Sequence, residues 1–219
     1  MVLLDLDKLL ARGTVPDFLL RKGIRRLVKK RVKKQNKFSV EERFEYLSQF
    51  IKELKKQPIA VETEAANEQH YELPPQFFKK ILGRNLKYSC CLWSDDLSYK
   101  KLKKQSDLQQ KLDQAEDEML ELTAQRAEIK NGQNILELGC GWGSLSFYLA
   151  KKFSDSRIIS ISNSRLQIDY INQLAAQNKI DNLRAVKADI NNFKTEAKFE
   201  RIVSVEMFEH LRNYQKLMQ

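Results

Sequence analysis

The segment "VEMFEH" holds two carboxylates and an imidazole within five positions. Glu206 follows an apolar, β-branched run, and Glu209 and His210 come three and four residues later. An imidazole titrates near neutral pH and can accept a proton, while a carboxylate can orient a polar group beside it. The spacing predicts one cluster, either catalytic or simply the polar start of a helix. The string also suggests a metal site, but the only other histidine, His70, is far away in the sequence, so we expect no metal.

A glycine-rich turn is the second place where the sequence indicates chemistry. Gly139, Gly141 and Gly143 occupy alternate positions in "NILELGCGWGSLSFYLA", in a chain that has seven glycines in all. The turn follows an apolar run and precedes a helical pattern. Without Cβ atoms, the backbone there can approach a ligand closely at the start of the helix. A tight connection with no ligand is the alternative.

Two kinds of ligand suit such a turn. A dinucleotide site requires glycine or alanine where Ser144 stands and an acidic residue at the end of the second strand, where this chain has Ser162 and Asn163. Glu137, two residues before the first glycine, matches instead the E-x-G-x-G-x-G turn of S-adenosylmethionine-dependent methyltransferases. We therefore expect S-adenosylmethionine rather than a nicotinamide dinucleotide.

Alternating strands and helices must position these groups. Short β-branched runs at 134–139, 157–162, 183–188 and 201–206 predict four strands, and the segment 164–178 has helical periodicity. This order predicts βαβ units, hence an α/β fold with a parallel sheet. Ligands bind such sheets beyond the carboxyl ends of the strands, where the glycine turn would lie.

The amino-terminal part of the chain is helical and basic. Of the net charge of +10, residues 1–60 contribute 16 Lys and Arg against 7 Asp and Glu. The segment 20–34 predicts a basic amphipathic helix with Leu20, Ile24, Leu27 and Val28 on one face. It either packs on the main domain or meets an anionic surface, and a membrane is favoured over nucleic acid because the segment has no aromatic residues to stack on bases. Ser39 and Glu42 predict a capping box for a second helix.

Composition narrows the class of protein. A hydrophobic fraction of 42% with 31% charged residues is typical of a globular protein, and no apolar run is long enough to cross a membrane. The start of the chain lacks a basic leader, which argues against a secretory signal. Cys90, Cys91 and Cys140 form no recognisable disulfide framework. We expect a cytoplasmic protein, with peripheral membrane contact as an option.

Three long stretches resemble one family. They are "HYELPPQFFKKILGRNLKYSCCLW", "ILELGCGWGSLSFYLA" and "RIVSVEMFEHLRNY". Their order and spacing resemble the cyclopropane-fatty-acyl-phospholipid synthase and coclaurine N-methyltransferase family, whose fold is the Rossmann-like sheet of class I methyltransferases. The stretches "YSCCLW" and "VEMFEH" are more similar to the coclaurine N-methyltransferase branch, because the lipid branch tends to have glycine where Glu206 stands.

The resemblance implies S-adenosylmethionine as cofactor and assigns residues to it. Tyr88 and Ser89 would close over its methionine end, although Tyr88 could be a core aromatic. The glycine turn would approach the methionine and ribose parts. Asp189 would meet the adenine end, unless it only caps a turn. Ser162, Asn163 and Gln167 would contact the ribose, with amide oxygens accepting hydroxyl protons.

The resemblance also implies roles for the "VEMFEH" cluster. In the N-methyltransferase branch the acceptor is a small-molecule amine, so His210 would take a proton while Glu206 or Glu209 orients the nitrogen. In the lipid branch the matching Glu and His, together with the cysteine at Cys90, hold a bicarbonate that acts as base. Because those residues are present here, methylene transfer to an unsaturated lipid is the alternative.

We expect three parts in the chain. Residues 1–58 form the basic helical arm, 59–130 a helical segment covering the cofactor, and 131–219 a Rossmann-like domain that lacks its carboxyl-terminal strands. Family members continue beyond the position of Gln219, so the fourth strand is expected at an exposed edge. The chain is then a methyltransferase, the amino-terminal part of one, or an inactive remnant.

Overall fold

The computed structural model of the chain describes residues 9–10, 12–61, 73–93 and 105–219. These residues divide into two compact units, 1–54 and 55–219, which we describe separately. The stretches 62–72 and 94–104 lie outside the described residues, and His70 lies in the first of them. Within the described part, no helix is long and apolar enough to cross a membrane.

The described residues of the first unit include the helices α2 (Asp17–Gln35) and α3 (Val40–Leu54). The predicted capping box is present at the start of α3. The Ser39 amide donates to Glu42 Oε2 at 2.7 Å, and the Glu42 amide donates to Ser39 Oγ at 3.2 Å. These bonds satisfy two backbone amides that the start of a helix would otherwise leave unpaired. The basic segment 20–34 is helical as predicted, because it lies within α2.

The second unit contains the predicted parallel sheet. Its strands are β1 (Asn134–Leu138), β2 (Arg157–Ser162), β3 (Leu183–Lys187) and β4 (Arg201–Ser204), in the order β3-β2-β1-β4. Leu138 pairs with Ile161 on one side and with Ser204 on the other. β4 is therefore an edge strand of this sheet, and its Ile202 is 61% exposed.

The prediction that Glu206 ends the fourth strand is wrong. β4 pairs with β1 only as far as Leu138 and Ser204, because β1 then turns away at Gly139. Glu206 has a left-handed backbone with φ of 51°, in the turn between β4 and the short 3₁₀ helix η2 (Phe208–His210). Glu209 and His210 thus belong to a 3₁₀ turn, which is followed by α9 (Tyr214–Leu217).

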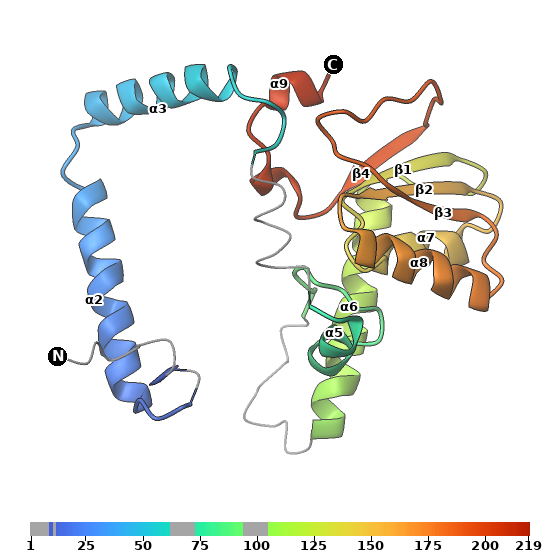
Figure 1. The fold of residues 1–219 in the computed structure, drawn as a ribbon, viewed down its shortest axis with the longest axis horizontal. Helices are drawn as coiled ribbons and strands as arrows, with labels where there is room; N and C mark the ends of the chain where they lie inside the picture. The colour runs from blue at the N-terminus through green and yellow to red at the C-terminus, as the bar shows by residue number, and fades with distance from the viewer. Residues whose placement is uncertain (1–8, 11, 62–72, 94–104) are drawn as a thin grey trace. The chain divides into compact units, whose positions relative to one another are not determined.

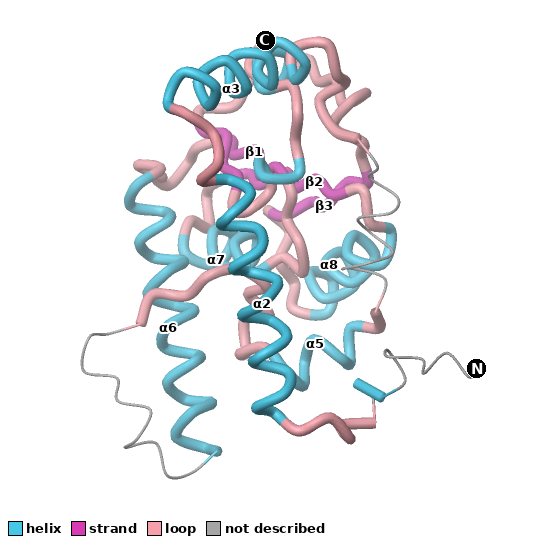
Figure 2. The backbone as a smooth tube through the Cα atoms, turned by 90° about the vertical axis from the view of Figure 1, so that its left-hand side faces the viewer, coloured by secondary structure: helices cyan, strands magenta, loops and turns pink. Residues whose placement is uncertain are grey.

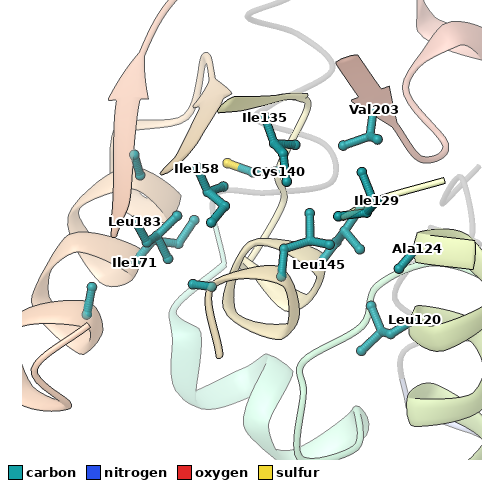
Figure 3. Packing of buried hydrophobic residues seen from close by; sticks show 14 of the residues in the cluster. Leu120, Ala124, Ile129, Ile135, Cys140, Leu145, Ile158, Ile171, Leu183 and Val203 are labelled. Carbon is teal, nitrogen blue, oxygen red and sulfur yellow. The ribbon is translucent and has the colours of Figure 1, made fainter. Parts of the chain in front are cut away.

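Helices cover one face of the sheet. Figures 1 and 2 show α7 (Ser144–Lys152) and α8 (Arg165–Gln177) on the same side of the strands. α6 (Gln105–Arg126) packs against α7, and α5 (Pro75–Ile81) precedes it in the chain. Figure 3 shows how the core joins these layers: Leu120 of α6, Leu145 of α7 and Ile171 of α8 pack in one cluster with Ile135 and Ile158. Burying such side chains stabilises the sheet as a rigid platform.

Candidate functional site

A pocket lies beyond the carboxyl ends of all four strands. In the order β3-β2-β1-β4, β2 lies on one side of β1 and β4 on the other, so the direction in which strands are added reverses at β1. Parallel sheets bind ligands at such a switch point. The loops that follow the strands supply the lining: Gly139, Cys140, Gly141 and Trp142 after β1, Ser162 and Asn163 at the end of β2, Ala188, Asp189 and Ile190 after β3, and Val205, Glu206 and Met207 after β4.

The structure requires glycine at the three positions of the turn for different reasons. All have positive φ, at 78°, 53° and 86° for Gly139, Gly141 and Gly143. A Cβ on Gly139 would lie 2.8 Å from the sulfur of Met207, and one on Gly143 would lie 2.8 Å from Ile171. A Cβ on Gly141 would meet no atom within 4 Å, although Gly141 lines the pocket. Only Gly141 therefore leaves space that a ligand could fill.

Glu137 is buried at the floor of the pocket. Its carboxylate accepts hydrogen bonds from the hydroxyls of Ser146 on α7 and Ser160 on β2, the latter at 2.9 Å. Burial raises the pKa of Glu137 to about 7, and the two serine hydrogen bonds only partly oppose that rise. The acidic residue of the glycine motif therefore ties β1, β2 and α7 together.

We expect this pKa to make the folded chain less stable at neutral than at mildly acidic pH. Between about pH 4.5 and 7 the folded chain holds a proton on Glu137 that the unfolded chain has lost, so the free energy of unfolding falls as the pH rises. The shift corresponds to roughly 3 kcal/mol. Glu137→Gln keeps a hydrogen-bond acceptor but cannot ionise. Denaturant unfolding at pH 5 and 7.5 tests this: the difference between wild type and variant should change with pH, and a constant difference would contradict the assignment.

The end of β2 leads into α8 through a polar network. Ser162 Oγ donates to Gln167 Oε1 at 2.8 Å, and the Ser164 side chain caps α8 by accepting from the Gln167 amide. The amide oxygen of Gln167 thus accepts one hydrogen bond within the protein and has a second lone pair, so its contact with ribose hydroxyls stays a prediction. Gln167 Nε2 and Trp142 Nε1 are instead buried donors without a partner among the described residues. Both residues line the pocket, so a ligand with acceptor atoms would satisfy them.

Asp189 lines the pocket and also caps a turn, and its contact with the adenine end of the cofactor stays a prediction. Its Oδ1 accepts from the Asn191 amide at 2.9 Å. The Asn191 side chain in turn binds both backbone groups of Ala60, at 2.9 and 3.1 Å. Ala60 lines the pocket and pairs with Leu211, which follows His210. Ala60 and Val61 therefore form part of the pocket wall.

A turn at 83–87 places Tyr88 and Ser89 at the rim of the pocket. The buried carboxylate of Glu116 on α6 accepts from the amides of Gly83, Asn85 and Lys87, at 2.9, 2.8 and 3.3 Å. A Cβ on Gly83 would lie 2.6 Å from this carboxylate, so the turn requires glycine there. Tyr88, which packs edge-on against Phe78, is half exposed.

The candidate catalytic residues gather at the mouth of the site. Glu206, Glu209 and His210 line a shallow hollow with Tyr88 and Ser89, and both Glu206 and His210 also reach the main pocket. The Cys90 amide donates to Glu206 Oε1 at 2.8 Å.

The charge of Glu206 is stabilised at this position. Burial opposes ionisation, but hydrogen bonds from Cys90 and the charge of Lys87 outweigh it and hold the pKa of Glu206 below its ordinary value. The same carboxylate raises the pKa of the Cys90 thiol. Cys90 is exposed and lines neither hollow, but both its amide and its thiol interact with Glu206, which joins it to the cluster.

Several lining residues were not predicted from the sequence. Trp142 lies inside the glycine motif and Met207 inside "VEMFEH", so their positions within these motifs could have predicted that they line the pocket. Lys87 is buried beside Ser89, where a lysine would normally be assigned to the surface. Ala60 offered no signal. Within the described residues, no group of three or more His, Cys, Asp or Glu could hold a metal ion.

The fold and the pocket are those of a class I methyltransferase, and comparison with known proteins identifies the family. Residues 60–219 match the family model described as mycolic acid cyclopropane synthetase. The chain therefore belongs to this family. It is 36% identical over 217 residues to (S)-coclaurine N-methyltransferase from Thalictrum flavum subsp. glaucum, covering 99% of this chain and 57% of that protein.

Solved structures support the same placement. A coclaurine N-methyltransferase bound to N-methylheliamine and SAH superposes with a TM-score of 0.85 at 33% identity, covering 100% of this chain and 59% of that one. A mycolic acid cyclopropane synthase complexed with SAH and CTAB gives 0.54 at 27% identity, covering 67% and 46%. The predicted likeness to the coclaurine N-methyltransferase branch is confirmed. The chain spans a little more than half the length of these N-methyltransferases.

Proposed function

We propose that this chain is an S-adenosylmethionine-dependent methyltransferase, or the amino-terminal part of one, that methylates an amine-type small molecule. The observation that carries the proposal is the pocket at the switch point, which joins the open side of Gly141 to the cluster of Glu206 and His210. The coclaurine and tetrahydroprotoberberine N-methyltransferases among its relatives support an amine acceptor.

The residues present fit the cofactor. Gly141 leaves open space beside a backbone that a ligand can approach, and Trp142 Nε1 and Gln167 Nε2 are donors in need of acceptors. In this proposal, residues 59–130 cover the cofactor, with Tyr88 and Ser89 at its methionine end. Glu137 and the glycine turn lie below it, Ser162, Asn163 and Gln167 beside the ribose, and Asp189 at the adenine end.

Methyl transfer does not require the protein to form a covalent bond with the substrate. The cofactor supplies a methyl group already activated on a sulfonium, so the enzyme must align a neutral nucleophile and remove its proton. Glu206, held by the Cys90 amide, and Glu209 orient the nitrogen, and His210 takes the proton. A carboxylate favours an amine over the double bond of an acyl chain, which offers it nothing to bond.

Methyl transfer to small amines and to unsaturated phospholipid tests the proposal. It should be measured for the chain alone and for the chain extended by the corresponding carboxyl-terminal part of a relative. We expect methylated amine from the extended chain. Cyclopropane product would assign the lipid branch instead. Failure of both chains to bind SAH would leave the inactive remnant as the better interpretation.

We further propose a cytoplasmic location, with α2 as a peripheral contact to anionic membrane through residues 20–34. The apolar side chains of Ile24, Leu27 and Val28 are 60%, 69% and 54% exposed, and α2 has no buried residue. Lysines and arginines surround these three positions. A helix with this pattern can bury its apolar side chains among lipid tails while its cations meet anionic headgroups.

We predict that replacing Arg25, Arg26, Lys29 and Lys30 by glutamine weakens binding to anionic vesicles at least about tenfold, since each cation near such a surface contributes about 1 kcal/mol. Wild-type binding should also fall as salt is added. The matched control replaces four exposed lysines of the other unit: Lys151, Lys179, Lys194 and Lys198. Equal losses in both variants would indicate that net charge, rather than α2, governs vesicle binding.

A further inference from the structure

Lys87 is a buried cation at the cofactor pocket. The residue is 3% exposed and lines both the main pocket and the shallow hollow that holds Glu209. Its Nζ donates a hydrogen bond to Ser89 Oγ. An ammonium has three protons to donate, and Ser89 Oγ is its one hydrogen-bond partner among the described residues, so donor capacity remains in a place that water reaches poorly.

The fold forces this side chain inward. The Lys87 amide is held by the buried carboxylate of Glu116 at 3.3 Å, and the preceding Leu86 has a left-handed backbone with φ of 51°. The Gly83 and Asn85 amides bind the same carboxylate, so both ends of the turn are fixed to α6. Lys87 and Ser89 therefore face the pocket from a positioned backbone.

No carboxylate of the described residues forms an ion pair with Lys87. The charge of Lys87 helps to lower the pKa of Glu206, but that carboxylate does not lie within ion-pair distance of Lys87. A buried charge without a close partner is costly, and an anionic ligand in the pocket would remove that cost. A protonated amine acceptor would instead be repelled, which argues that Lys87 serves an anion.

We propose that Lys87 binds the carboxylate of the methionine part of S-adenosylmethionine and S-adenosylhomocysteine. This inference rests on the proposed function, which puts the methionine end beside Tyr88 and Ser89. Ser89 Oγ, already joined to Lys87 Nζ, completes the contact with the carboxylate. Charge-assisted hydrogen bonds of this kind are stronger than neutral ones and select for the amino-acid end of the cofactor.

The test compares two ligands that differ only in that carboxylate. S-adenosylhomocysteine and its decarboxylated form, S-adenosyl-3-thiopropylamine, are titrated into wild type and Lys87→Met by calorimetry. We expect wild type to prefer S-adenosylhomocysteine by about tenfold or more, the range of a charge-assisted hydrogen bond. Lys87→Met should lose most of that preference while retaining the decarboxylated ligand, which also serves as a control for its folding.

Lys80→Met, an exposed lysine on α5, is the matched control and should keep the wild-type preference. An unchanged preference in Lys87→Met, or an equal loss of both ligands, would overturn the assignment while leaving the proposed function intact. A wild-type chain that binds neither ligand would refute the proposed function, and the inference with it. The outcomes therefore separate the two claims.

Discussion

We expect Gly141→Val to lower the affinity for S-adenosylhomocysteine by at least about 100-fold. The only open space beside the glycine turn is at this residue, where a Cβ would meet no protein atom within 4 Å. A valine side chain would occupy that space and exclude a ligand from the backbone. Its branched Cβ also disfavours the local φ of 53°. Calorimetric titration measures the effect directly.

Gly132→Val is the matched control for backbone strain. Gly132 also has a left-handed φ, at 85°, and a Cβ there would likewise meet no atom within 4 Å, but the residue does not line the pocket. It should lose stability yet keep its affinity for S-adenosylhomocysteine. Wild-type affinity in Gly141→Val would show that no ligand approaches the turn, and equal affinity losses in both variants would point to strain alone.

The strands were predictable because each buries β-branched side chains in a short run, and β1, β2 and β3 begin where those runs begin. The residue at which β4 ends was not predictable in this way. Strand length depends on the partner as well as on composition, and β1 stops offering backbone groups after Leu138. Val205 continues the apolar run in sequence without continuing the ladder, and Glu206 follows it in the turn.

The site was predictable where motifs are local. Glycines, Glu137 and the "VEMFEH" cluster lie in continuous stretches, and the sheet brings those stretches to one edge. Contacts between distant segments carried no such signal. The Glu116 carboxylate reaches the turn at 83–87 across about thirty positions, and Met207 fills the space beside Gly139 from the turn that follows β4. Such pairings depend on how helices and loops pack, which a single sequence does not encode in any local pattern.

His210→Ala in the carboxyl-terminally extended chain is expected to lower methyl transfer to an amine by about 100-fold or more, the range for loss of a general base. His210 reaches both the cofactor pocket and the hollow that holds Glu206 and Glu209, so it can meet an acceptor nitrogen close to the methyl group. Affinity for S-adenosylhomocysteine should change little. Glu206→Gln should have an intermediate effect, since an amide oxygen still accepts a hydrogen bond.

The pH dependence of the rate separates a proton acceptor from a residue that only shapes the pocket. If His210 takes the proton, His210→Ala should change the pH profile of turnover as well as its rate. Arg212→Ala, an exposed neighbour of the same loop, should keep both rate and profile. An unchanged rate in His210→Ala would eliminate it as the base. A reduced rate that retains the wild-type profile would mean that His210 aligns the acceptor and that another group takes the proton.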